Sequence, residues 1–156
     1  MIQWLTIFLV SSFAVGKQIN ADEIVKVNVP KVIVQAGKSS VINVTVEVKE
    51  GYHIQAYKVN NEFIIPTTLE INGDKEIILK RQVFPSAKQF KLEGTDVHLD
   101  VYDGRFEINI FFKTRKEIQK GIHQLNGKLN YQACDSVRCL FPRVIDFSID
   151  VEVGKN

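Results

Sequence analysis

Hydrophobic and polar side chains alternate along much of the chain that follows its first two dozen residues. The clearest case is the segment 40–51, SVINVTVEVKEG, in which Ile42, Val44, Val46 and Val48 are separated by single polar residues. A period of two places successive side chains on opposite faces of a β-strand. The segment therefore predicts a strand with one face on a hydrophobic core and the other face in water.

Short segments rich in β-branched residues recur along the rest of the chain. Further strands are predicted at residues 24–29, 31–37, 68–71, 75–84, 106–113, 123–133 and 144–153. Turn-forming residues follow or separate them at Asn72–Asp74, Glu93–Asp96 and Asp103–Gly104. No long window has the period of an amphipathic helix. Roughly seven to nine strands with regularly spaced turns predict an all-β fold, an immunoglobulin-like antiparallel β-sandwich.

The N-terminal segment differs from everything after it. Residues Ile2–Val15 are mostly apolar, and the small residues Ala14 and Gly16 stand at their end. This is the length of the apolar region of a signal peptide and short for a membrane span. No Lys or Arg precedes it, so an N-terminal anchor is the alternative. Residues 1–21 are predicted to be a signal peptide or anchor, and residues 22–156 a single exported domain, periplasmic or secreted.

Composition and charge exclude several function classes. The chain is 45% hydrophobic and 24% charged, with a net charge of +2, and its basic residues are scattered among acidic ones. Nucleic-acid binding needs a basic stripe, so no nucleic-acid partner is expected. The common hydrolase, zinc-protease, phosphate-loop and dinucleotide motifs are absent from the sequence. We therefore expect no cofactor and no small-molecule ligand.

The only two cysteines, Cys134 and Cys139, lie in one short segment. A structural disulfide between them would close a six-residue loop and stabilise the fold by only about 2 kcal/mol. A disulfide that closes a fifty-residue loop contributes roughly 4 kcal/mol. A metal site needs further ligands, and His53, His98 and His123 lack the short spacings typical of such sites. A structural bridge, a metal site and a redox pair all remain open at this point.

Charged and aromatic neighbours bear on a redox role. Arg138 precedes Cys139 and favours a thiolate there, whereas Asp135 beside Cys134 has the opposite effect. Cys139 is therefore predicted to be the exchanging sulfur. Tyr131, Arg138 and Phe141 are candidates for contacting a partner, although an aromatic residue is more often part of a core.

Four segments resemble the N-terminal periplasmic domain of DsbD, the bacterial thiol:disulfide interchange protein. The cysteine segment is YQACDSVRCLFP, Tyr131–Pro142. Three others occur in the expected order, at Glu50–Ile71 with GYHI and IPT, at Phe84–Phe90 with FPSAKQF, and at Val101–Phe112 with VYDGRFEINIFF. The similarity extends over nearly all of the chain after the leader.

The resemblance implies an immunoglobulin-like sandwich and a reversible disulfide between Cys134 and Cys139. It implies a thiol:disulfide oxidoreductase of the protein-disulfide reductase type, in which Cys139 forms the mixed disulfide and Cys134 resolves it. As a free-standing domain it is expected to exchange electrons in trans, with thioredoxin-like periplasmic proteins or a membrane electron conduit. The alternative from another class is an exported β-sandwich binding or accessory module with a passive structural disulfide.

The chain departs from the family pattern at one point. Better-known members shield the cysteines with a loop that carries a phenylalanine. The corresponding stretch here, Leu92–Asp100, contains no aromatic residue. Shielding is therefore expected to come from another residue or to be weaker.

Overall fold

The computed structural model describes residues 24–59 and 63–154, so the predicted leader, residues 1–21, lies outside the described residues. The described residues form twelve strands and no helix. The strands are β1 (Val25–Asn28), β2 (Val32–Val34), β3 (Ser39–Val48), β4 (His53–Gln55), β5 (Thr68–Asn72), β6 (Ile77–Val83), β7 (Lys88–Lys91), β8 (His98–Tyr102), β9 (Arg105–Thr114), β10 (Gly121–Tyr131), β11 (Ala133–Cys134) and β12 (Arg143–Val153). Within these ranges, no helix has the length and apolar character needed to cross a membrane.

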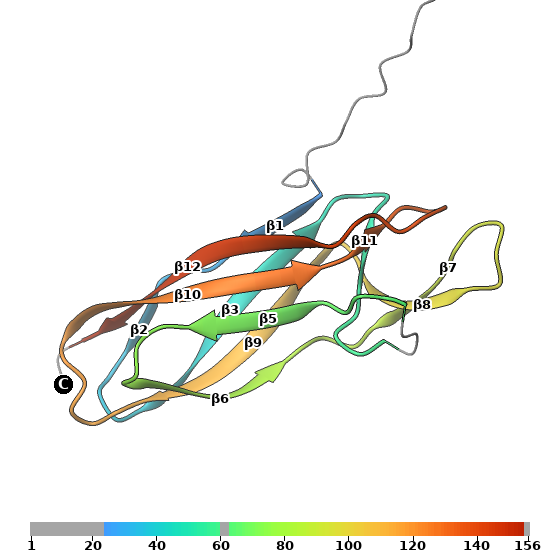
Figure 1. Cartoon of the computed structure of the whole chain (residues 1–156). Helices are drawn as coiled ribbons and strands as arrows, with labels where there is room; N and C mark the ends of the chain where they lie inside the picture. Colours follow the sequence, from blue (N-terminus) through green and yellow to red (C-terminus); the bar gives the residue numbers. More distant parts are fainter. Residues whose placement is uncertain (1–23, 60–62, 155–156) are drawn as a thin grey trace, which may run out of the picture.

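Two four-stranded sheets form the body of the molecule (Figure 1). One has the order β1-β3-β9-β6, and the other has the order β2-β12-β10-β5. All neighbouring strands in them are antiparallel except β2 and β12, which pair in parallel. The sheets face each other as a sandwich, which confirms the predicted immunoglobulin-like fold.

The hydrophobic core lies between these two sheets. Its fully buried side chains come from both, with Ile42 and Val44 on β3, Ile108 on β9, and Leu125 and Leu129 on β10. The polar residues between the core positions of β3 are mostly on the outer face, as the alternation predicted. Removing these side chains from water is the main source of stability for such a fold.

A third four-stranded sheet, β11-β4-β8-β7, lies at one end of the sandwich (Figure 1). The sequence did not predict β4, β7 or β8, so the expected count of seven to nine strands was too low. These strands have three to five residues, and β7 has a single hydrophobic residue, Phe90. So few positions cannot show a reliable alternation. The predicted strand 123–133 is also divided, because the chain leaves the ladder at Gln132 between β10 and β11.

At the opposite end, His123 on β10 is held between two acceptors. Its Nδ1 lies against the carboxylate of Asp74, and its Nε2 is 2.8 Å from the carbonyl oxygen of Gln119. The hydrogen bond to Asp74 raises the pKa of His123 above its ordinary value. The backbone N–H of Glu76, followed by His123 itself, lowers the pKa of Asp74. Each partner therefore favours the charged form of the other.

We expect this pair to make stability depend on pH. His123, with its raised pKa, contributes fully below its ordinary value of about 6.5, and the contribution is lost as the pH rises through the folded-state value. Replacing Asp74 with Asn should therefore lower the free energy of unfolding more at about pH 6 than at about pH 9. Urea denaturation of both proteins measures this difference. An equal loss at both pH values would contradict the assignment.

Candidate redox site

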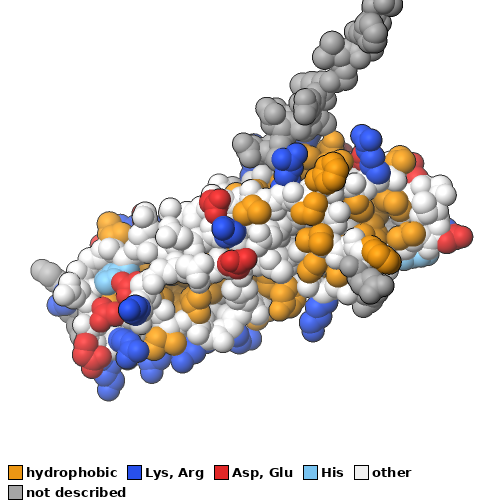
Figure 2. All heavy atoms as spheres, viewed as in Figure 1, with side chains coloured by type: hydrophobic (Ala, Val, Ile, Leu, Met, Phe, Trp, Pro, Cys, Tyr) orange, Lys and Arg blue, Asp and Glu red, His pale blue; other side chains and the backbone are white. Residues whose placement is uncertain are grey.

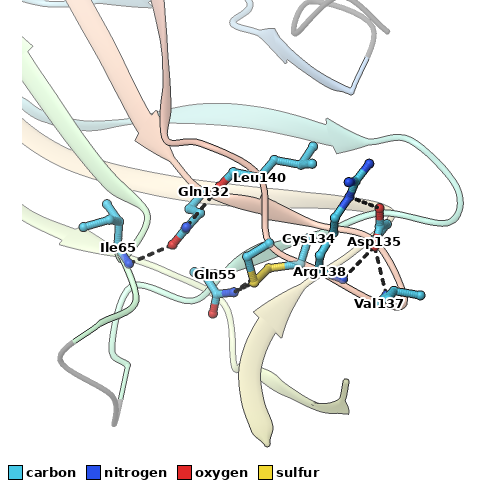
Figure 3. Close-up of a disulfide and its surroundings, with 9 residues drawn as sticks. Gln55, Ile65, Gln132, Cys134, Asp135, Val137, Arg138 and Leu140 are labelled. Carbon is cyan, nitrogen blue, oxygen red and sulfur yellow. Dashed lines mark hydrogen bonds and ion pairs between the residues drawn. A yellow bond between two sulfur atoms is a disulfide. The ribbon is translucent and has the colours of Figure 1, made fainter. Parts of the chain in front are cut away.

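The pairing of β11 with β4 fixes the position of the first cysteine. Cys134 lies opposite His53, and Ala133 lies opposite Ile54. On its other edge β4 pairs with β8, where Ile54 lies opposite Tyr102. Cys134 is 0% exposed, although β11 is an edge strand of this small sheet at the end of the sandwich (Figure 3).

A tight turn places the second cysteine against the first. The carboxylate Oδ1 of Asp135 accepts hydrogen bonds from the backbone N–H groups of Val137 at 2.9 Å and Arg138 at 2.8 Å. The backbone N–H of Asp135 donates to the carbonyl oxygen of Arg138 at 3.0 Å, which closes the turn. Cys134 and Cys139 then pair across an antiparallel bridge with their Cα atoms 3.9 Å apart, and a disulfide joins them. Cys139 is partly exposed, unlike Cys134.

Apolar side chains from neighbouring segments cover the cysteines. Cys134 forms a small buried cluster with Leu99 and Val101 of β8, separate from the main core. The partly buried side chains that pack against this cluster are Ile64, Phe90, Leu92 and Cys139. Phe90, two residues before the stretch Leu92–Asp100, is therefore the aromatic residue that packs against this cluster.

Two contacts hold the β7–β8 hairpin near the cysteine turn. The ring of Phe90 stacks on His53, the residue opposite Cys134, with ring centroids 4.0 Å apart. Beyond β7, the backbone N–H of Glu93 donates to the carbonyl oxygen of Ser136 at 2.8 Å. Ser136 belongs to the turn between the two cysteines. The hairpin is thus attached to the turn that it helps to cover.

Two glutamine side chains lie beside the disulfide (Figure 3). Gln55 on β4 is completely buried, and its Nε2 lies 2.9 Å from the Cys134 sulfur and 3.6 Å from the Cys139 sulfur. Gln132 instead joins two backbone segments, because its amide donates to the carbonyl oxygen of Leu140 and accepts from the N–H of Ile65. Sequence reasoning missed Gln55, which lies 79 residues before Cys134, although it follows directly after the GYHI residues of the segment Glu50–Ile71.

The charges near the disulfide are balanced locally. The guanidinium Nε of Arg138 lies 3.7 Å from the carboxylate Oδ2 of Asp135, and the Arg138 side chain is 77% exposed. Burial raises the pKa of Asp135, but the N–H groups of Val137 and Arg138 and the Arg138 charge outweigh it, so the pKa is lowered. Arg138 therefore shares its charge with an ionised carboxylate instead of acting on Cys139 alone.

The remaining sequence candidates fall into different environments. Phe141 is 85% exposed beside the cysteine turn, where a partner protein can reach it. Tyr131 is only 1% exposed and belongs to the main core. We therefore remove Tyr131 from the residues expected at a partner surface. Hydrophobic side chains also gather on the face of the molecule near the end that holds β11 (Figure 2).

The three histidines considered as metal ligands do not gather around the cysteines, where only His53 lies. His123 is paired with Asp74 at the far end, and the Nδ1 of His98 lies 3.2 Å from the carbonyl oxygen of Asp96. His53 is stacked on Phe90. Within residues 24–59 and 63–154, no group of three or more His, Cys, Asp or Glu side chains is arranged to hold a metal ion.

Fold and site together define an immunoglobulin-like sandwich that carries a local disulfide at one end. The sequence profile of the family described as thiol:disulfide interchange protein DsbD, N-terminal, matches residues 19–150. The chain therefore belongs to the DsbD N-terminal family, whose general activity is thiol–disulfide oxidoreduction. No curated protein matches the chain.

Solved structures agree in fold. The reduced DsbD N-terminal domain of Neisseria meningitidis is 15% identical, with a TM-score of 0.51 over 86% of this chain and 90% of that one. The N-terminal periplasmic domain of ScsB from Proteus mirabilis is 18% identical, with a TM-score of 0.54 over 83% of this chain and 45% of that one. A type I cohesin from Pseudobacteroides cellulosolvens is 12% identical, with a TM-score of 0.53 over 85% of this chain and 95% of that one. At these identities the likeness shows the fold alone.

We expect Phe90 to slow reduction of the disulfide. An aromatic stacking contact contributes about 1 kcal/mol, so replacing Phe90 with Ala should speed reduction by dithiothreitol roughly fivefold. The rate is measured by quenching with an alkylating agent and counting free thiols.

The matched control is Phe84→Ala. Phe84 also stacks on an aromatic ring, that of Tyr57, with centroids 4.3 Å apart, but packs against the main core. Equal acceleration in both variants would indicate general loosening, and an unchanged rate in Phe90→Ala would mean that Phe90 does not shield the bridge.

Proposed function

We propose that the chain is a thiol–disulfide exchange module that passes electrons between thioredoxin-like proteins through its Cys134–Cys139 disulfide. The observation that carries the proposal is the unequal exposure of the two sulfurs in one turn. Cys134 is fixed in a strand and fully buried, whereas Cys139 lies on the turn and is partly exposed. An accessible sulfur next to a sheltered one is what a two-step exchange requires.

The exchange is balanced in atoms and electrons. In the reduced module, the Cys139 thiolate attacks a partner's disulfide, forms a mixed disulfide and releases one partner sulfur as a thiolate. The Cys134 thiolate then attacks the Cys139 sulfur, which forms the Cys134–Cys139 bond and releases the second partner sulfur. Two electrons pass from the module to the partner, and the released thiolates take up the protons that the two cysteines gave up. A partner dithiol reduces the module by the reverse sequence.

The surface around Cys139 supports a protein as the partner. Val137 and Phe141 flank the turn and are exposed, and Ile65 is exposed on the segment that Gln132 attaches to the turn. Exposed apolar side chains beside a reactive group are typical of protein docking surfaces. Because relatives with this fold include a periplasmic domain, we place the module in the periplasm, where its disulfide can persist.

The competing function is an exported binding module with a passive bridge. The burial of Cys134 and the apolar cover from Phe90 and Leu92 are the observations that favour it. Under this alternative the bridge is inert and only stabilises the turn. The two functions differ in the reduction potential of the bridge and in its reaction with other proteins.

We expect the bridge to exchange with glutathione or dithiothreitol and to have a reduction potential above about −300 mV, the region below which structural disulfides of secreted proteins usually fall. Thiol trapping across redox buffers measures the potential, and circular dichroism monitors the fold in both states. A potential below this mark, or unfolding on reduction, would favour the passive bridge.

We expect the two cysteines to differ as trapping variants. With Cys134 replaced by Ala, the module cannot resolve a mixed disulfide on Cys139. A thioredoxin-like partner that keeps only one active-site cysteine, activated as a mixed disulfide with 2-nitro-5-thiobenzoate, supplies a leaving thiolate and no second partner thiol, so its covalent complex with Cys139 should accumulate and disappear on reduction. The matched Cys139→Ala variant leaves only the buried sulfur and should form little complex. Similar yields from both variants would show that exposure does not assign the roles. Non-reducing gel electrophoresis provides the readout.

A further inference from the structure

Hydrogen bonds made by the backbone N–H and carbonyl groups of Gln55 fix the direction in which its side chain points. Its backbone N–H donates to the carbonyl oxygen of Gln132 at 3.0 Å, and its carbonyl oxygen accepts the hydroxyl of Thr67. The residue is 0% exposed, and its amide nitrogen lies 2.9 Å from the Cys134 sulfur. The amide therefore approaches the sulfurs from the side of β4, away from solvent.

Gln55 is costly to bury in this position. A disulfide sulfur is a weak acceptor, and the Oε1 atom of Gln55 has no hydrogen-bond partner among the described residues. An unsatisfied buried polar atom destabilises a fold, and an apolar side chain of similar length avoids that loss. The stability of the oxidised protein therefore does not explain why an amide faces the sulfurs.

We propose that Gln55 stabilises the Cys134 thiolate during the resolving step of disulfide exchange. This inference rests on the exchange function proposed above. A thiolate is an anion, and burial disfavours it, but an N–H donor aimed at the sulfur offsets that penalty.

Gln55 neither gives nor takes a proton in this step. The mixed disulfide joins Cys139 to a sulfur of the oxidised partner, and Cys134 has released its proton to water. The Cys134 thiolate then forms a bond with the Cys139 sulfur while the bond between Cys139 and the partner breaks. The partner sulfur departs with the bonding electron pair and takes up a proton from water. Gln55 donates its N–H to the Cys134 sulfur until the charge has left it.

The test measures the Cys134 thiol directly and needs no partner. In a Cys139→Ala background, the thiolate absorbance of Cys134 is followed against pH with Gln55 intact and with Gln55→Met. Loss of one N–H donor should decrease the thiolate fraction at a given pH about tenfold, a shift of about one unit in the midpoint. The free energy of unfolding should be unchanged or higher, because the unpartnered Oε1 atom is gone.

Gln132→Met is the matched control. Gln132 has the same side chain and lies two residues before Cys134 in the sequence, but its amide bonds to Leu140 and Ile65 and to neither sulfur. This variant should lower stability and leave the Cys134 midpoint unchanged. If Gln55→Met does not shift the midpoint, or if Gln132→Met shifts it equally, the inference is wrong.

A measurement on unaltered Gln55 covers the case in which Gln55→Met does not fold. In the same Cys139→Ala protein, the side-chain N–H signals of Gln55 in nuclear magnetic resonance spectra should change with the midpoint of the Cys134 thiol. Signals that do not respond would overturn the inference. The exchange function fails separately, through an inert bridge in the wild-type redox titration, whereas an unshifted Cys134 midpoint overturns only the role of Gln55.

Discussion

The antiparallel pairing of β11 with β4 is the interaction on which the site depends. It is only two residues long, yet it places Cys134 opposite His53 and beside Gln55. The chain then turns at once through the Asp135 hydrogen bonds, so the next cysteine returns to the first from the solvent side. The difference between a buried and an accessible sulfur therefore follows from a strand that ends at Cys134.

The side chains that stabilise the fold are largely separate from those that surround the cysteines. The main core lies between the two larger sheets, whereas Cys134 belongs to a second, small cluster with Leu99 and Val101. A bridge that closes a six-residue loop contributes only about 2 kcal/mol, so we expect the main core to stay intact when it opens. The third sheet, at the end of the sandwich, holds the cysteine site. Local rearrangement costs the least free energy in regions with few buried contacts.

The sequence predicted the parts of the fold that repeat a simple pattern. The long strands β3, β9, β10 and β12 alternate over ten or eleven residues, and their positions were confirmed. The third sheet was not predicted because its strands are too short to show a period of alternation. Its pairing partners, such as His53 and Cys134, are also distant in sequence. For the same reason Gln55 and Phe90 could not be assigned to the cysteine site. Tyr131 was a candidate for a partner contact only because it is close to the cysteines in sequence, and the structure places its ring in the main core.

The arrangement of charges bears on how reactivity is divided between the sulfurs. Arg138 was expected to activate Cys139, but its ion pair with Asp135 places a carboxylate within the same turn. A balanced pair exerts a weaker field on a nearby thiolate than a lone guanidinium does. Cys139 therefore owes its role chiefly to exposure, while the protein's one fixed donor to the sulfurs among the described residues, Gln55, lies closer to Cys134. Cohesins share this architecture, so the sandwich alone does not determine the function. In this chain the sandwich carries a polar group, the Gln55 amide, aimed at the sulfur that solvent cannot reach.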